Sequence, residues 1–287
     1  MKNFGFVVFV AFALCMLSCE EEENPLLDFG VAYRPDLYGP VPSFEPSGPA
    51  HQRVLLEDFT GHDCGNCPNG HVIAHDLLDA HGEDLAVVAI HAGSLAAPFP
   101  PDFPNDWTTP EGTYYLLTQV GADVMPKGRI NRNPGASTTF NPSGWTAQYD
   151  QAITQTPPVN LQMKTNFAEA NAHLNIHIQE DWKSDFTGDA HLVILITESN
   201  IVAPQLWYGQ SPEYIPDYVH AHMLRASATG ATGLVNTSNP LAGTIKTTSY
   251  TLDWNDQWDP LQCEVVAFLT DGENGRVLNV VKAPVVP

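Results

Sequence analysis

The chain has 287 residues, of which 43% are hydrophobic and 16% charged, so it is long enough for one large domain or two of ordinary size with packed cores. Its 33 acidic residues outnumber the 12 Lys and Arg, which gives a net charge of −21 at pH 7. Such a surface repels phosphate backbones and anionic lipid headgroups, and this argues against nucleic-acid binding and against electrostatic docking to membranes.

The N-terminus is typical of a secretory leader. Residues 1–18 contain one basic residue, Lys2, followed by a hydrophobic run of the length expected for a signal peptide. The run ends in MLSC, which resembles a bacterial lipobox, and in such a box the cysteine is lipidated and becomes the mature N-terminus. We therefore predict a signal peptide over 1–18 and a membrane anchor at Cys19. Cleavage near Ser18 without lipid is the alternative.

An acidic, proline-rich segment over residues 19–52 follows the leader. Positions 20–23 are four glutamates, which stay solvated and extended by mutual repulsion. The run resembles the acidic tag of surface-exported lipoproteins in some Gram-negative bacteria, and a plain solvated spacer is the alternative. The prolines that follow predict a tether rather than a folded domain.

Residues 53–156 show an alternation of strand and helix patterns. In chain order the expected elements are a strand in RVLLEDFTG, a helix in HVIAHDLLDAHG, a strand in DLAVVAIHAG, a helix in TYYLLTQVG, a strand in MPKGRINR and a helix in SGWTAQYDQAITQ. The sequence HDCGNCPNG places a CxxC pair between the first strand and its helix. This order is that of the thioredoxin plan, so we predict an α/β thioredoxin-like domain.

Residues 157–287 show recurring strand patterns with little helical periodicity. AHLNIHIQ alternates strictly, which predicts that Leu174, Ile176 and Ile178 point inward and that the residues between them face water. Strands at this spacing favour an all-β, immunoglobulin-like sandwich as the second of two domains. Cys263 begins one β run without an obvious partner and is expected to be buried as an apolar side chain.

Three motifs together carry a family resemblance. VLLEDFTGHDCGNCPNGH, AIHAG and MPKGRINR, in this order, resemble the outer-membrane-protein-28-related lipoprotein family, whose members have a thioredoxin-like domain followed by a β-rich domain. The resemblance implies that Pro126 is a cis proline facing the CxxC pair and that Met125 before it pairs with the backbone of a substrate peptide. An ordinary trans turn is the alternative.

The CxxC pair is the main candidate for chemistry. A helix N-terminus offers free N–H groups and partial positive charge, which stabilise a thiolate. We expect Cys64 to be the exposed, attacking sulfur and Cys67 the resolving thiol, joined as a disulfide at rest because an exported compartment is oxidising. A structural disulfide is the second possibility, although closing so short a loop stabilises a fold weakly.

A metal site is the third possibility for the same segment. Cys64, Cys67, His71 and His75 fall on one helical stripe, and ligands strung along one helix cannot surround a tetrahedral ion. A partial copper site through the first three remains open as a minor alternative. We predict neither a metal nor another cofactor.

His91 ends a predicted strand on the side where α/β folds place their functional residues, so it is a candidate proton relay near the CxxC pair. A satisfied structural histidine is the alternative. His220 and His222 alternate in YVHAHML, which is thin evidence for a metal. The aromatic loop APQLWYGQSPEYIPD suits either a recognition surface or packing over the end of the sandwich.

Together these features predict an outer-membrane lipoprotein that exchanges thiols and disulfides with extracytoplasmic proteins or peptides. Thr60, Gly61 and Met125 are expected to line the approach to Cys64. The alternative is a surface binding protein or adhesin whose disulfide is structural. The sequence leaves the oligomeric state and the orientation in the membrane open.

Overall fold

The computed structural model describes residues 31–121, 124–169 and 172–287. The predicted signal peptide, the predicted lipidation site at Cys19 and the acidic run lie outside these residues. Strands predominate over helices in the described part, and none of its helices has both the length and the apolar character needed to cross a membrane.

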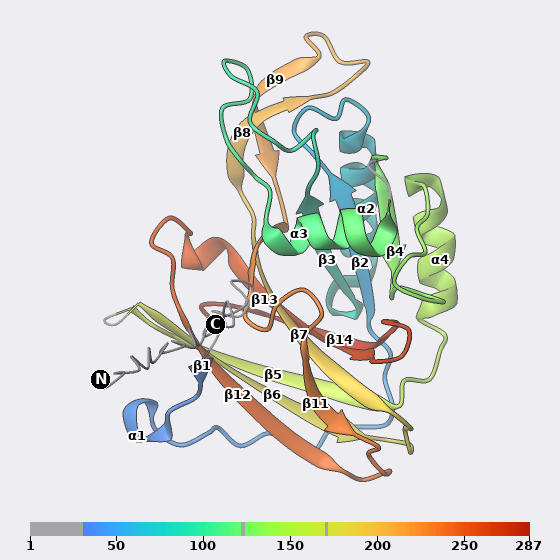
Figure 1. The fold of residues 1–287 in the computed structure, drawn as a ribbon, viewed down its shortest axis with the longest axis vertical. Helices are drawn as coiled ribbons and strands as arrows, with labels where there is room; N and C mark the ends of the chain where they lie inside the picture. The colour runs from blue at the N-terminus through green and yellow to red at the C-terminus, as the bar shows by residue number, and fades with distance from the viewer. Residues whose placement is uncertain (1–30, 122–123, 170–171) are drawn as a thin grey trace, which may run out of the picture.

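Two large sheets carry the fold (Figure 1). In the described part of the chain the first has four antiparallel strands in the order β1-β12-β6-β5. Their bounds are β1 Val31–Ala32, β12 Ile245–Asp253, β6 His173–Trp182 and β5 Val159–Ala168. Ile176 of β6 pairs with Tyr250 on one side and Thr165 on the other, so β6 is a central strand.

The second sheet joins both halves of the sequence. Its path is β14-β13-β7-β10-β3-β2-β4, with β11 also paired to β7. The bounds are β14 Val277–Pro284, β13 Cys263–Asp271, β7 Asp189–Glu198, β10 Met223–Ser227, β3 Leu85–His91, β2 Val54–Thr60, β4 Lys127–Ile130 and β11 Leu234–Ser238. Because strands from 53–156 and from 157–287 share this sheet, the two predicted units form one hydrogen-bonded layer; their boundaries stay a prediction.

Side-chain alternation divides the second sheet between two faces. On β7, Val193 and Leu195 belong to one hydrophobic cluster, while Leu192, Ile194 and Ile196 belong to another that faces the four-stranded sheet. The period of two along a strand produces this division. The face bearing Val193 is covered by a helical segment, and the opposite face by the first sheet and by two further helices.

Helices pack on the part of the second sheet that contains β2, β3 and β4. The helices and turns are α1 Pro35–Tyr38, α2 Cys67–His81, η1 Gly82–Asp84, α3 Pro110–Tyr114, the π-helical turn η2 Tyr115–Val120, η3 Pro142–Gly144, α4 Trp145–Ala152 and η5 Pro260–Gln262. Side chains of α2 and α4 pack on one face with Leu56 and Val87, and η2 packs on the other with Phe59 and Ile90. The predicted order of helices and strands in this region is therefore observed.

The alternation predicted for β6 is only half right. Leu174, Ile176 and Ile178 are buried in the core between the sheets, as expected. Asn175 and His177, which were expected to face water, are also buried. The physical reason is that residues 31–52 lie along this outer face and cover it.

The segment predicted as a tether is thus packed on the first sheet where it is described. β1 pairs with β12, and the ring of Tyr33 meets that of His177 edge-on at 4.7 Å. Ser47 donates a hydrogen bond to Asp181, and the backbone N–H of His51 donates to Asn160. These contacts fasten the chain to the sheet before it enters β2.

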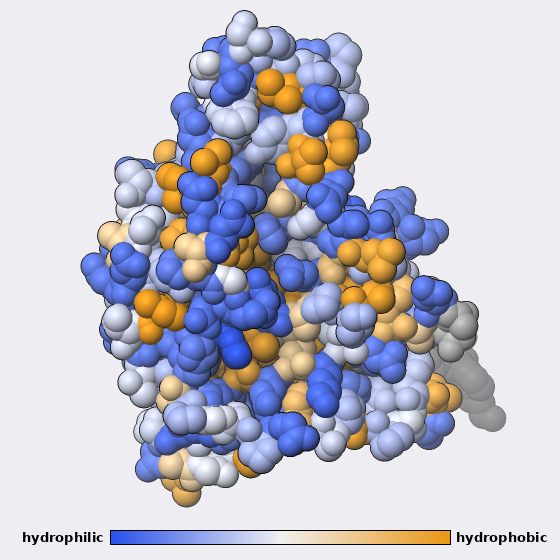
Figure 2. Space-filling model, turned by 180° about the vertical axis from the view of Figure 1, so that it is seen from behind, coloured by the Kyte–Doolittle hydropathy of each residue, from blue (hydrophilic) through white to orange (hydrophobic). Residues whose placement is uncertain are grey.

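A separate hairpin stands beyond the two sheets. It consists of β8 Ile201–Leu206 and β9 Tyr214–His220, and it lies at the top of Figure 1. The strand predicted through YVHAHML is therefore interrupted, because β9 ends at His220 and β10 begins at Met223. Hydrophilic residues dominate the face seen in Figure 2, and its hydrophobic residues form separate patches.

Candidate functional site

The CxxC pair lies in the turn between β2 and α2. β2 ends at Thr60, and α2 begins at Cys67 with Pro68 in its first turn, where a missing N–H leaves no bond unmade. Cys64 and Cys67 form a disulfide, as predicted, with sulfurs 2.01 Å apart. Cys64 thus precedes the helix and Cys67 is its first residue.

Strand register brings the other predicted residues to the same end of the sheet. Thr60 is opposite His91 in the parallel pair of β2 with β3. Phe59 is opposite Lys127 in the antiparallel pair of β2 with β4, which puts Pro126 level with Thr60. The Met125–Pro126 peptide is cis, as the resemblance implied.

The exposure predicted for Cys64 is wrong. Only 4% of its surface is accessible, and Cys67 is fully buried. The sequence places the pair correctly in a loop before a helix, but such loops are exposed only where no other part of the chain covers them. Here the hairpin of β8 and β9 covers the loop.

Backbone hydrogen bonds join this hairpin to the CxxC loop. Leu206 donates its N–H to the carbonyl of His62, and Tyr208 donates its N–H to the carbonyl of Gly65, each at 2.8 Å. The ring of Tyr208 lies so close to Gly65 that a Cβ there would be 2.6 Å from it. A residue between the two cysteines is therefore in direct contact with an aromatic ring.

On its other side the loop packs on the segment after β3. A Cβ at Gly61 would lie 2.4 Å from the carbonyl oxygen of Leu95, closer than any side chain permits. Asp63 donates its N–H to that same carbonyl at 3.0 Å. Glycine at position 61 is thus required by packing, whereas the sequence had suggested only that it lines the approach.

Asp58 lies behind the disulfide and was not singled out as a functional residue from the sequence. It is 1% exposed and its Oδ1 has no hydrogen-bond partner in the described structure. Burial raises the pKa of Asp58 to about 8 because no cation compensates for the lost hydration. The signal in the sequence was an acidic residue inside an apolar strand.

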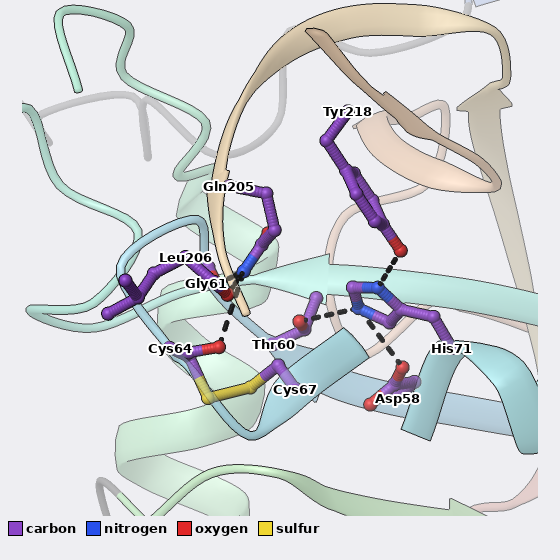
Figure 3. The surroundings of a disulfide bond; sticks show 9 residues. All are labelled: Asp58, Thr60, Gly61, Cys64, Cys67, His71, Gln205, Leu206 and Tyr218. Atoms are coloured by element: carbon purple, nitrogen blue, oxygen red, sulfur yellow. Dashed lines mark hydrogen bonds and ion pairs between the residues drawn. A yellow bond between two sulfur atoms is a disulfide. The ribbon is translucent and has the colours of Figure 1, made fainter. Parts of the chain in front are cut away.

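A chain of polar contacts leads from Asp58 to the hairpin. Nε2 of His71 lies 3.8 Å from Oδ2 of Asp58 and 2.8 Å from the hydroxyl of Thr60. Nδ1 of the same ring lies 2.8 Å from the hydroxyl of Tyr218 on β9 (Figure 3). The buried Thr60 therefore orients His71 inside the protein and does not line an open approach.

A cavity of about 250 Å³ lies between the hairpin, α2 and β3, and His91 and His220 line it. Their ring centroids are 5.4 Å apart, and their ring nitrogens have no hydrogen-bond partner within the described residues. Burial lowers the pKa of His91 well below its ordinary value, that of His220 to about 4 and that of His71 to about 3. At neutral pH the imidazoles of these three residues are therefore uncharged.

The remaining predicted residues have less central places. Met125 is partly buried against the core on the η2 face. His75 is exposed on α2. His222 lies in the bend between β9 and β10 at φ 54°. Cys263 is buried with a free thiol, as predicted. Among residues 31–121, 124–169 and 172–287, no cluster of three or more His, Cys, Asp or Glu side chains is arranged to hold a metal ion.

Comparison with known proteins gives one family and several similar folds. The model of the family "Outer membrane protein Omp28" matches residues 114–287, which is more than half of the chain but begins after the CxxC pair. A search of curated proteins found no match.

Among solved structures, this chain is similar to HBP35 of Porphyromonas gingivalis. The alignment covers 83% of this chain and 76% of HBP35, with 18% sequence identity and a TM-score of 0.64. The alignment with a protein of Agrobacterium tumefaciens covers 82% of this chain and 95% of that protein, with 13% sequence identity and a TM-score of 0.50. The alignment with a domain of the Porphyromonas gingivalis outer membrane lipoprotein Omp28 covers 46% of this chain and 90% of that domain, with 12% sequence identity and a TM-score of 0.32. At these identities the first two likenesses show fold alone.

Proposed function

The chain belongs to the Omp28 family of outer membrane proteins, and from this premise we propose that it is a lipoprotein whose Cys64–Cys67 pair exchanges disulfides with extracytoplasmic proteins. The family assignment confirms both the family predicted from the three motifs and the predicted outer-membrane location. Attachment through a lipid on Cys19 is part of the proposal, because two or more acyl chains would hold the protein stably at a membrane.

The proposal includes a thioredoxin-like unit over 53–156 and an immunoglobulin-like sandwich over 157–287. The sheet order β3-β2-β4, with β3 parallel and β4 antiparallel to β2, supports the first. The two facing sheets around one hydrophobic cluster support the second. The shared second sheet implies that these units fold as one body.

The observation that carries the proposed chemistry is a disulfide at the start of a helix with a buried carboxyl group, Asp58, on the strand behind it, whose Oδ1 has no hydrogen-bond partner in the described residues. In the reduced protein the Cys64 thiolate attacks a client disulfide, and one client sulfur leaves as a thiolate. Cys67 then loses its proton to a nearby base and attacks Sγ of Cys64, which releases the second client thiolate and restores the Cys64–Cys67 bond. Two electrons pass to the client, and an external dithiol must return them.

Several residues around the disulfide have a part in this scheme. Asp58 accepts the proton of Cys67 in its ionised form, and because its pKa is about 8, this form increases as pH rises toward 8. His91 is a relay across the cavity, working as a neutral imidazole. Met125 and Pro126 present the client backbone at the edge beside β2, and Gly61 lets the loop pack closely on the segment after β3.

A binding protein with a structural disulfide is the second candidate, and the burial of Cys64 favours it. A sulfur covered on all sides contributes to stability without meeting a client. The two candidates differ in whether the cover over the disulfide opens in the native protein.

Reduction of insulin by the full chain, with dithiothreitol as electron donor, tests the proposed exchange. Cys64→Ser is expected to lower the rate to the uncatalysed background, since the attacking sulfur is lost. Cys67→Ser is expected to accumulate a mixed disulfide between Cys64 and the client, since nothing resolves it. Cys263→Ala is the matched control and should keep the full rate. Equal rates with and without the unsubstituted protein would favour the binding protein.

A further inference from the structure

The hairpin of β8 and β9 is fastened to the CxxC loop mainly by hydrogen bonds. Besides the two backbone bonds to His62 and Gly65, the amide of Gln205 donates to the carbonyls of Gly61 at 3.3 Å and Cys64 at 3.2 Å. Four backbone carbonyls of the loop, those of Gly61, His62, Cys64 and Gly65, thus accept hydrogen bonds from residues at or just beyond the end of β8. Two of these four bonds come from backbone N–H groups, as in the docking of an extended peptide on exposed backbone carbonyls.

Apolar packing under the hairpin is slight. Of residues 201–220, only Ala203, Gln205 and His220 are buried, and two of these three are polar. None of the residues in this range belongs to the hydrophobic clusters of the core. The cavity lined by His91 and His220 occupies part of the space beneath. A segment with few buried apolar contacts opens more easily than the core does.

Both connections between the hairpin and the second sheet have unusual backbone angles. Asn200, between β7 and β8, has φ 59°, and His222, between β9 and β10, has φ 54°. Ser199 accepts the N–H of His222 at its hydroxyl, which ties the two connections together at 3.0 Å. Residues at the ends of elements that adopt such angles are suitable hinges for motion of the segment between them.

We propose that the hairpin is a hinged cover over the disulfide, and that an extended segment of the client chain replaces it by donating backbone N–H groups to the carbonyls of His62 and Gly65. This inference rests on the proposed function, since it names how a client reaches Cys64. The closed form keeps both sulfurs from solvent, and the open form exposes them. Clients are then selected by having an unpaired, extended backbone, as unfolded or edge-strand segments do.

Tyr208 offers the most direct way to loosen the cover. Its ring contacts Gly65 while 51% of the residue remains exposed, so Tyr208→Ala removes the contact without opening the core. Gly65→Ala tests the same contact from the loop side, because its Cβ would displace the ring. Val202→Ala is the matched control, since Val202 is on the same hairpin, is 65% exposed, pairs with Val219 within the hairpin and does not itself line the cavity.

The experiment measures how fast the phosphine TCEP reduces the Cys64–Cys67 disulfide in the folded full chain, with free thiols counted by alkylation and mass spectrometry. Tyr208→Ala and Gly65→Ala are expected to accelerate reduction roughly tenfold, because each 1.4 kcal/mol lost from the closed form multiplies the open population by ten. Val202→Ala should reduce at the unsubstituted rate. Equal rates in all four proteins would overturn the proposal.

Hydrogen exchange supplies an independent readout of the hinge motion. The amide protons of Leu206 and Tyr208 should exchange through local opening of the hairpin, at a free energy well below that of global unfolding. Their exchange rates should therefore depend only weakly on urea concentration. Protection of these amides equal to that of β2 would overturn the hinge. The outcomes separate the two proposals. If Tyr208→Ala speeds reduction by the phosphine but the protein does not reduce insulin, the cover is supported and the exchange activity is rejected. If the protein reduces insulin but Tyr208→Ala changes neither rate, the exchange activity is supported and the cover is rejected.

Discussion

Asp58→Asn is expected to stabilise the protein at alkaline pH and to have little effect in acid. In the unfolded chain this carboxyl group has a pKa of about 3.9, whereas burial raises the pKa of Asp58 to about 8 in the folded protein. The folded state therefore holds a proton that the unfolded state has released. Its contribution is fully present below pH 4 and is lost progressively as pH rises to 8, which favours unfolding by 1.36 kcal/mol per pH unit.

The difference between Asp58→Asn and the unsubstituted protein should reach on the order of 5 kcal/mol by pH 8. Urea unfolding at pH 5 and pH 8 measures it as a shift in midpoint. Burial lowers the pKa of His71 to about 3 and that of His220 to about 4, so both rings are neutral in the folded protein at pH 5 and at pH 8 and contribute little to the difference. Asp79→Asn, on the exposed side of α2, is the control and should show no such pH dependence. A shift of the same size at both pH values would contradict the assignment.

Glu57→Gln is expected to destabilise the protein by about 3–5 kcal/mol. Glu57 is fully buried, and its carboxylate accepts hydrogen bonds from Arg129 at 2.7 Å and from Arg132 at 2.7 and 2.9 Å. Burial alone would raise the pKa of Glu57, but the two guanidinium groups outweigh it and hold the pKa below its ordinary value. Removing the carboxylate leaves two buried cations without their counter-charge.

The same linkage sets the pH at which this stability is lost. Because the pKa of Glu57 is lowered on folding, its contribution is present above about pH 4.3 and disappears as pH falls through the lower folded value. Urea unfolding at pH 7 measures the cost, with the exposed Glu83→Gln as control. The double variant Glu57→Gln, Arg132→Met should cost less than the sum of the two single changes. A cost for Glu57→Gln within about 0.5 kcal/mol of zero, as at ordinary surface sites, would contradict the account.

Glu57 and Asp58 show how far the sequence alone can be taken. Both are acidic residues in the apolar strand pattern VLLEDF, and the pattern correctly predicted a buried strand. Neighbouring positions on a strand point to opposite faces. Glu57 meets Arg129 and Arg132 on one face, whereas Asp58 on the other face meets the cavity and the uncharged ring of His71. Which carboxyl is ionised depends on residues more than 70 positions away, and the strand pattern does not contain that information.

The sequence predicted the features of the site that depend on neighbouring residues, and it missed the cover, which depends on residues distant in the sequence. The CxxC loop, the start of α2 and the position of Pro126 beside β2 follow from short-range patterns and from the family resemblance. The cover does not, because Leu206 and His62 are far apart in sequence and their hydrogen bond depends on the long-range arrangement of the chain. The aromatic loop had been considered for packing over an end of the sandwich. It forms the hairpin that packs over the disulfide.

The described part of the N-terminal segment gives a similar lesson. Its prolines suggested a tether, yet residues 31–52 pack on the outer face of the first sheet. Proline excludes this segment from the sheet interior but does not prevent it from lying flat against a surface. The buried Asn175 and His177 had looked solvent-facing only because the covering segment is distant in sequence.

The reduction potential of the Cys64–Cys67 pair is the most direct test of whether this disulfide takes part in exchange. Equilibrating the full chain with defined ratios of reduced and oxidised glutathione, trapping by acid, and counting alkylated thiols gives the value. We expect a potential between about −120 and −270 mV, the range of thiol–disulfide catalysts. A potential below about −300 mV, where structural disulfides lie, would contradict the exchange function and leave a binding protein with a closed disulfide.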